Sequence, residues 1–192
     1  MTTGQTGRQQ LLKSIVAIEL DMFERVKTSE PSLCKDRPET FKVMRGMTHS
    51  VLSTEILESY LEDLHEAKAN GRNLLAEKYA RMDNSIPPLK TNPVINDIAE
   101  IEACWMQRLS EEYPHTFKGG PGFRVYLASE LETYSDKTLG LYFDHIAKAE
   151  KEGRNLAEER YNLLFQQIGY GSIAEAEKKA TDSNRRDGEE DL

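Results

Sequence analysis

Residues 70–79 read NGRNLLAEKY, and residues 152–161 read EGRNLAEERY. The four residues Gly-Arg-Asn-Leu are identical in the two segments, and a glutamate and a tyrosine follow at the same distances. The second segment lies 82 positions after the first. If the two segments belong to a repeated unit, the residues around them should match at the same offset.

Residues on the N-terminal side of the two segments do match. The identical pairs are Phe41 and Phe123, Val43 and Val125, Ser53 and Ser135, Leu57 and Leu139, Tyr60 and Tyr142, and Ala67 and Ala149. Further upstream, an offset of 83 aligns Ile15, Ile18, Glu19 and Arg25 with Ile98, Ile101, Glu102 and Arg108. The sequence therefore predicts a tandem duplication of a unit of about 80 residues, which is longer than the common solenoid repeats. We expect two similar halves packed about a pseudo-twofold axis.

Each half is predicted to fold into four helices. Apolar residues recur at helical spacing, as in Leu11, Ile15, Met22 and Val26, and no apolar run is bounded by turns as a strand would be. The expected helices cover 8–27, 39–52, 53–70 and 73–82 in the first half, and 95–112, 123–134, 135–152 and 155–168 in the second. The predicted fold class is all-α, with two tandem four-helix repeats and a short C-terminal helix.

A single helical domain is expected over residues 1–180. The linker between the repeats contains adjacent prolines at positions 87 and 88, which stop a helix. Ser172 and Glu175 have the spacing of a capping box, so a last helix should begin there. The expected parts are repeat one (about 8–82), the linker (83–94), repeat two (about 95–168), the terminal helix (172–180) and a disordered tail (181–192).

Gly71 and Gly153 are expected where one helix ends and the next begins, because glycine adopts the left-handed backbone conformation that ends many helices. The arginine after each glycine, Arg72 or Arg154, has two interpretations. It either hydrogen-bonds the last carbonyls of the preceding helix, where a cation suits the helix dipole, or it binds the carboxylate or phosphate of a ligand.

The composition is that of an acidic, water-soluble chain. Of the 192 residues, 38% are hydrophobic and 30% are charged, and the formal net charge is −8. This charge argues against binding to nucleic acid or to an anionic membrane surface. No apolar run approaches the roughly 20 residues that span a bilayer, and the N-terminus lacks the apolar centre of a secretory signal. Two cysteines cannot form a disulfide framework, so we expect a cytoplasmic protein.

Glu19 and Glu102 are the first candidate functional residues. Glu19 lies on the apolar face of its predicted helix, between Ile15 and Met22, and the aligned Glu102 lies between Ile98 and Trp105. A carboxylate among core positions is unfavourable unless it is paired. Its presence in both halves makes an accident less plausible, and it suggests an acid, a base or a ligand-binding group.

Partners for these carboxylates are predicted on the second helix of each half. Arg45 follows Phe41 by four positions and faces inward, with His49 one turn later; Glu130 and Tyr134 occupy inward positions in the second half. One interpretation is a buried ion-pair network joining the halves. The other is a polar ligand pocket between the halves. In that pocket Glu19 and Glu102 would be catalytic, and the ligand-binding residues would be Arg45, His49, Glu130, Tyr134 and Trp105. Trp105 has the alternative of simply filling the core.

The sequence gives weaker support for a metal site or a reactive cysteine. Glu62 and His65 form a single Glu-x-x-His, whereas carboxylate di-metal bundles use two such units, so no metal site is predicted. Cys34 lies beside basic residues that lower a thiol pKa, but the sequence favours a loop cysteine without a role. No cofactor is assigned.

Several motifs together resemble a known family. They are Glu19-x-Asp-Met-Phe, Cys34, Thr40-Phe41-x-x-Met44-Arg45, the GRNL…EKY segment, Glu132-Thr-Tyr-Ser-x-x-Thr-Leu and Gly169-Tyr170-x-Ser172. The chain resembles the domain-of-unknown-function family 4125 over about 12–178. The resemblance implies that Glu19, Cys34, Arg45, Glu132 and the Gly-Arg-Asn segment matter, but it implies no reaction.

Two hypotheses follow, and the sequence leaves open whether the protein is an enzyme. In the first, the protein acts on or binds a small molecule between the halves. In the second, it is a helical interaction module, and its buried glutamates and arginine are structural ion pairs. The physiological partner is not indicated in either case.

Overall fold

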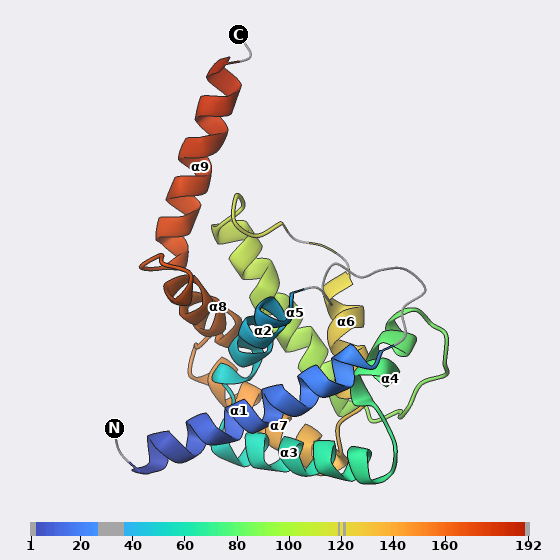
Figure 1. The fold of residues 1–192 in the computed structure, drawn as a ribbon. Helices are drawn as coiled ribbons and strands as arrows, with labels where there is room; N and C mark the ends of the chain where they lie inside the picture. Colours follow the sequence, from blue (N-terminus) through green and yellow to red (C-terminus); the bar gives the residue numbers. More distant parts are fainter. Residues whose placement is uncertain (1–2, 27–36, 119, 121, 191–192) are drawn as a thin grey trace.

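The computed structural model describes residues 3–26, 37–118, 120 and 122–190, with side chains over residues 6–183 of these ranges. The described residues form nine α-helices and no strand, which confirms the all-α prediction (Figure 1). The helices are α1 (Thr3–Glu24), α2 (Pro38–Ser50), α3 (Thr54–Ala69), α4 (Leu74–Met82), α5 (Val94–Glu112), α6 (Gly122–Leu131), α7 (Asp136–Lys151), α8 (Leu156–Gln167) and α9 (Ile173–Glu190). None of these helices is long and apolar enough to cross a membrane.

The starts of four helices follow from local hydrogen bonds. Ser53 and Ser135 cap α3 and α7, because their side chains accept from the backbone N–H three residues later. Asn73 and Asn155 cap α4 and α8 in the same way. Asn73 also donates to the carbonyl of Met22 at 2.7 Å, which ties this cap to the end of α1.

The two Gly-Arg-Asn-Leu segments form matching turns. Gly71 has φ +68° and Gly153 has φ +70°, and each closes the preceding helix in a Schellman motif. Arg72 and Arg154 do not bind helix carbonyls through their side chains. Each guanidinium instead forms two hydrogen bonds with the glutamate five residues later, Glu77 or Glu159. The segment therefore links consecutive helices in both places where it occurs.

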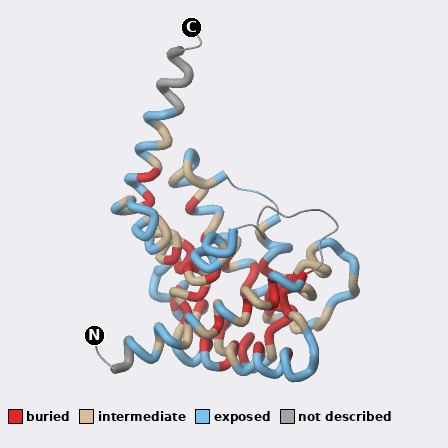
Figure 2. The backbone as a smooth tube through the Cα atoms, viewed as in Figure 1, coloured by how far each residue is buried: buried red, intermediate tan, exposed pale blue. Residues whose placement is uncertain are grey.

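The helices pack in a pattern that is unchanged when α1–α4 are exchanged with α5–α8. α1 packs on α2, α3 and α4, and α5 packs on α6, α7 and α8. Between the two sets, α4 packs on α6, α2 on α8, and α3 on α7. Packing about a pseudo-twofold axis would give this pattern, although the duplication itself stays a prediction. Most of the buried residues lie in the interior of this eight-helix body (Figure 2).

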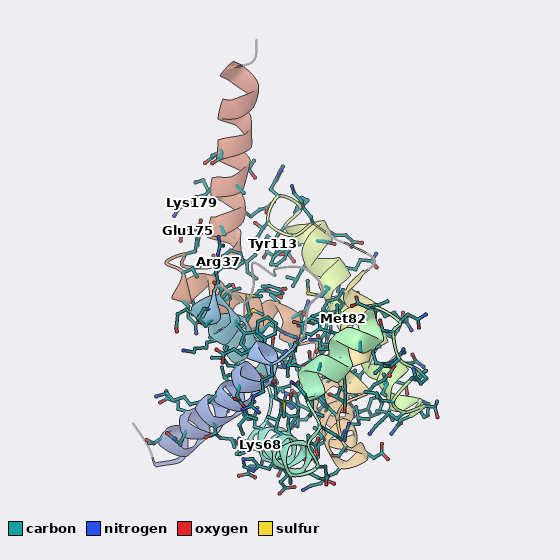
Figure 3. All side chains as sticks on the ribbon, turned by 45° about the vertical axis from the view of Figure 1, so that its right-hand side comes forward. Arg37, Lys68, Met82, Tyr113, Glu175 and Lys179 are labelled. Carbon is teal, nitrogen blue, oxygen red and sulfur yellow. The ribbon has the colours of Figure 1, made fainter. Side chains whose placement is uncertain are left out.

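α9 stands apart from this body (Figure 1). It packs on α8 through its first turns, where Ile173 and Ala176 are buried. The observed helix runs to Glu190, whereas the sequence predicted a helix end at 180 and a disordered tail over 181–192. An ion pair one turn apart, Glu175 with Lys179 at 3.0 Å, supports its start (Figure 3).

The linker between α4 and α5 is held by Glu132. The carboxylate of Glu132 accepts two hydrogen bonds from the guanidinium of Arg81 and one from the backbone N–H of Leu89. Glu132 follows α6 directly, so one carboxylate connects the linker to both α4 and the end of α6. This contact explains an acidic residue that is almost fully buried.

Candidate functional site

Arg45 lies at the centre of a buried cluster that joins α1, α2 and α6. Its Nε and Nη2 atoms donate to the two carboxylate oxygens of Glu19 at 2.9 and 2.6 Å. Its Nη1 and Nη2 atoms also donate to the two oxygens of Glu130 at 3.1 and 2.8 Å. Arg45 is 4% exposed, and Glu19 is fully buried. One guanidinium therefore holds two carboxylates in paired geometry.

Other polar groups complete the Arg45 network, which we define as Glu19, Arg45, His49, Tyr60, Lys78, Glu130 and Tyr134. The ammonium of Lys78, 2% exposed, lies 2.5 Å from Glu130 Oε2. The Tyr60 hydroxyl donates to Glu19 at 2.8 Å, and the Tyr134 hydroxyl donates to Glu130 at 3.0 Å. Two cations, Arg45 and Lys78, thus face two carboxylates in a region with little access to water.

His49 is the member of the network that has a ring nitrogen without a hydrogen-bond partner. Its Nε2 lies 3.0 Å from Glu19 Oε1 and 3.3 Å from Arg45 Nη2. If Nε2 carries a hydrogen it donates to the Glu19 carboxylate, and if it carries none it accepts from Arg45. His49 Nδ1 is buried and has no hydrogen-bond partner among the described residues.

The charges in the Arg45 network stabilise one another. Burial acts to raise the pKa of Glu19, but Arg45 and His49 outweigh it and lower this pKa from 4.5 to about 2. Burial opposes ionisation of Glu130 as well, yet Arg45 and Lys78 bring its pKa well below the usual value. Burial and the nearby carboxylates raise the pKa of Tyr60 and Tyr134 well above 10. Both glutamates therefore remain ionised at neutral pH.

Glu102 belongs to a second, smaller network with Tyr142 and Arg160. The Tyr142 hydroxyl donates to Glu102 at 2.9 Å, and Arg160 Nη2 donates to the other carboxylate oxygen. Burial acts to lower the pKa of Arg160, but Glu102 outweighs it and the pKa is raised. Across the described residues, no hydrogen bond or ion pair joins Glu102 to Glu19 or to Arg45. The two glutamates predicted to be catalytic thus lie in different clusters.

Five of the seven predicted site residues lie together: Glu19, Arg45, His49, Glu130 and Tyr134. Glu102 lies in the second network. Trp105 is fully buried, and its indole N–H donates to Glu150 at 2.5 Å, so it fills the core of the second half. The ligand-binding and catalytic roles of these residues stay predictions.

Sequence reasoning missed the residues that complete both networks, Lys78, Arg160, Tyr60 and Tyr142. A signal was present, because Lys78 and Arg160 align at the offset of 82 and each follows a buried leucine, Leu74 or Leu156, by four positions. Tyr60 and Tyr142 align in the same way.

Glu62 and His65 lie apart from these networks. Glu62 and His65 are exposed, and Glu62 pairs with Lys137 at 2.7 Å. Within the described ranges, no group of three or more His, Cys, Asp or Glu side chains is placed to hold a metal ion. Cys34 lies outside the described residues.

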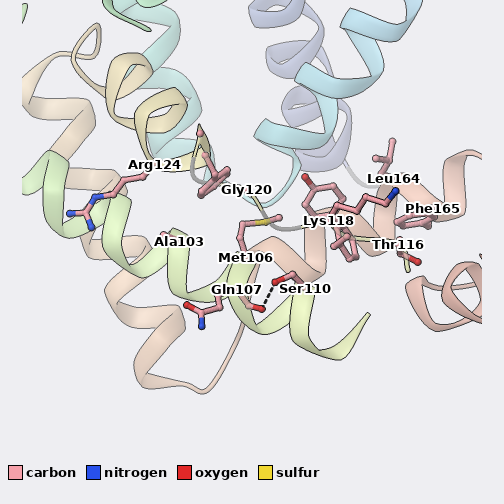
Figure 4. A pocket seen from close by; sticks show the side chains of 14 residues that line it. Ala103, Met106, Gln107, Ser110, Thr116, Lys118, Gly120, Arg124, Leu164 and Phe165 are labelled. Carbon is pink, nitrogen blue, oxygen red and sulfur yellow. Dashed lines mark hydrogen bonds between the residues drawn. The ribbon is translucent and has the colours of Figure 1, made fainter. Parts of the chain in front are cut away.

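A partly open cavity of about 860 Å³ lies in the second half, between α5, α6, α8 and the segment that follows α5 (Figure 4). Its lining residues are Ala103, Met106, Gln107, Ser110, Thr116, Phe117, Lys118, Gly120, Gly122, Phe123, Arg124, Tyr161, Leu164 and Phe165. Its volume falls within the range of about 300–1,000 Å³ that is usual for ligand sites. We call it the α5–α6–α8 cavity.

Two smaller cavities, of about 180 and about 300 Å³, lie beside α1. None of the three cavities is lined by a member of the Arg45 network or by Glu102, Tyr142 or Arg160. The α5–α6–α8 cavity and the buried ionic clusters are therefore separate features of the molecule.

Comparison with known proteins gives a family but no activity. The family model described as "Protein of unknown function (DUF4125)" matches residues 9–178, which include both networks and the α5–α6–α8 cavity. No curated protein and no solved structure was found to match the chain. The match covers most of the chain and agrees with the motifs around Glu19 and Arg45. The protein belongs to the DUF4125 family.

Proposed function

We propose that this protein binds a small organic molecule in the α5–α6–α8 cavity, and that the Arg45 network is a structural ion-pair cluster. The observation that supports the proposal is the cavity itself. It has the size of a small-molecule site, and aromatic and aliphatic side chains such as Met106, Phe117, Phe123 and Phe165 form much of its lining. Ligand pockets commonly have an apolar lining with a few polar groups.

The paired charges of the Arg45 network support a structural role for it. The four oxygens of Glu19 and Glu130 all accept hydrogen bonds from Arg45, and Lys78 balances the remaining charge. In some proteins, buried polar or ionic groups specify the fold in this way. A general acid or base works best with a pKa near the working pH, whereas the pKa of Glu19 is about 2. These facts favour the interpretation of the glutamates as members of a buried ion-pair network.

The experiment measures binding of the neutral fluorescent probe N-phenyl-1-naphthylamine. In Ala103→Phe the added ring should occupy the cavity, because Ala103 lines it on α5. Ala69→Phe, at the exposed end of α3, is the matched control. Wild type and Ala69→Phe should bind the probe saturably, and Ala103→Phe should bind at least about tenfold more weakly.

Glu19→Gln separates the two candidate sites. If the cavity binds the ligand, this variant should lose stability but, once folded, should bind the probe as wild type does. The proposal fails if wild type shows no saturable binding or if Ala103→Phe binds normally. It also fails if a folded Glu19→Gln protein no longer binds the probe, because that result would indicate that the ligand binds at the Arg45 network.

A further inference from the structure

We propose that the ligand of the α5–α6–α8 cavity is an amphipathic organic anion, with an apolar body against the aromatic lining and one anionic group at Lys118. This inference rests on the proposed function and specifies its ligand class. It follows from the charges around the cavity, from the surroundings of Lys118, and from the contacts that hold the segment carrying Lys118.

The charge of the cavity differs in sign from that of the whole chain. The chain has a formal net charge of −8. The residues that line the cavity include two cations, Lys118 and Arg124, and no aspartate or glutamate. A cavity with only positive charges in its lining, in an acidic protein, is complementary to an anion.

The two cations differ in their partners. Arg124 forms an ion pair with Glu100 of α5, so its charge is already balanced. Lys118 forms no hydrogen bond or ion pair with any described residue. Figure 4 shows the end of the Lys118 side chain beside Leu164 and Phe165 of α8, while Arg124 lies at the other end of the cavity. The free positive charge thus lies next to the apolar lining.

The segment that carries Lys118 is held in place by α9. The two carboxylate oxygens of Glu177 accept from the backbone N–H groups of His115 and Thr116 at 3.0 and 2.8 Å. Phe117 then packs its ring edge against Tyr161, with centroids 4.8 Å apart, and against Phe165. The apolar lining beside Lys118 is therefore formed without a ligand.

This arrangement favours a ligand with two distinct parts. An apolar group would cover Phe117, Tyr161 and Phe165 and remove them from water, which favours binding. Lys118 is exposed, and an anionic group beside its unpaired ammonium would gain an attraction that salt screens. Gln107 and Ser110 on α5 line the same cavity and offer hydrogen bonds to polar atoms of the ligand. A carboxylate, a sulfonate or a phosphate satisfies the same requirement.

The experiment compares two probes that differ by one anionic group, 1-anilinonaphthalene-8-sulfonate and the neutral N-phenyl-1-naphthylamine. The variants are Lys118→Met, which keeps an apolar stem, Lys118→Arg, which keeps the charge, and Lys148→Met, an exposed control on α7. In Lys118→Met, affinity for the sulfonate should fall about tenfold and lose its dependence on salt, while affinity for the neutral probe stays the same. Lys118→Arg and Lys148→Met should resemble wild type.

Displacement of the bound probe identifies the ligand class further. Octanoate or octyl phosphate should displace it at lower concentration than octanol, and the comparison of the two anions shows which group Lys118 prefers. Equal displacement by octanol, or equal loss of both probes in Lys118→Met, overturns the anion assignment but leaves the cavity as a binding site. If neither probe binds wild type, the proposed function fails together with this inference.

Discussion

Arg45 binds Glu130 across the molecule, with Nη2 2.8 Å from Oε1, although the two residues lie 85 positions apart in the sequence. The contact joins α2 to α6, and the same guanidinium also holds Glu19 of α1. Three helices therefore depend on one side chain. The energetic cost of losing it should be much larger than for an ordinary surface arginine.

Arg45→Met should destabilise the protein by about 3–5 kcal/mol, because it leaves Glu19 and Glu130 buried without their main partner. Urea denaturation monitored by circular dichroism measures the change. Arg154→Met is the control: Arg154 also pairs with a glutamate, but on the surface, where loss of the pair costs under about 1 kcal/mol. A similar loss in both variants would contradict a structural role for the Arg45 network.

Stability should fall as the pH drops from about 4.5 toward 2. The pKa of Glu19 is lower in the folded protein, about 2, than the 4.5 of an ordinary glutamate. Its contribution is therefore fully present above pH 4.5 and is lost as the pH falls through the folded value. The contribution of this one group at neutral pH is on the order of 3 kcal/mol.

Urea midpoints measured between pH 2 and pH 7 test this dependence. Glu19→Gln removes the titrating group, so its stability should change less over the acidic range than that of wild type. If the urea midpoints of the two proteins change with pH in parallel, Glu19 does not titrate with a lowered pKa.

Tyr60→Phe and Tyr142→Phe should each cost about 1.5–3 kcal/mol, because each removes a buried hydrogen bond to a charged carboxylate. Tyr60 donates to Glu19 and Tyr142 donates to Glu102, with nearly equal O···O distances of 2.8 and 2.9 Å. Tyr126→Phe, on the exposed side of α6, is the control and should change stability little. A large cost in only one of the first two variants would argue against equivalent roles in the two halves.

Gly71→Ala and Gly153→Ala should each destabilise the protein by about 1–2 kcal/mol. Both glycines have positive φ, a backbone conformation that is unfavourable for residues with a Cβ atom. The matched control is Gly140→Ala inside α7, where an added Cβ meets nothing within 4 Å. That change should stabilise the helix by about 0.5–1 kcal/mol. Thermal denaturation of the three variants distinguishes these opposite effects.

Glu177→Gln should weaken binding in the α5–α6–α8 cavity while leaving global stability nearly unchanged. Desolvation acts to raise the pKa of Glu177, but hydrogen bonds from Thr116 and His115 outweigh it and lower the pKa. A neutral amide would hold these donors less strongly, so Phe117 and Lys118 would be less well positioned. Probe titration gives the affinity, and Glu175→Gln on the same helix is the control. Unchanged affinity in Glu177→Gln would show that α9 does not organise the cavity.

Helical spacing decides which side chains point inward. It pointed to five members of the Arg45 network but also to Glu102, which lies with Tyr142 and Arg160 instead. Phe41, Arg45 and His49 are each four positions apart, so an arginine on that stripe had to meet a buried partner. Lys78 was missed because α4 is short, and the inward direction of a nine-residue helix is hard to derive from so few apolar positions. The alignment of Lys78 with Arg160 held the missing information.

Other features depend on contacts that spacing does not determine. Arg72 and Arg154 lie at helix ends, where binding to carbonyls is common, but Glu77 and Glu159 offered a stronger, charged partner. The α5–α6–α8 cavity arises from the distance between α5, α6 and α8, and no local pattern in the sequence encodes that distance. The segment after α5 is held at the cavity by long-range contacts, which are the hydrogen bonds to Glu177 of α9 and the packing of Phe117 on α8.

The equal number of cations and carboxylates in the Arg45 network also limits which substitutions the family can accept at these positions. Two cations and two carboxylates share one interior, so replacement of any one of them leaves an unmatched ion in the core. Relatives in which Arg45 has become apolar should therefore carry a neutral residue at the position of Glu130 or Glu19 as well. Such substitutions would occur together in the same relatives. The positions of Arg45, Glu19 and Glu130 would then covary in an alignment of the family.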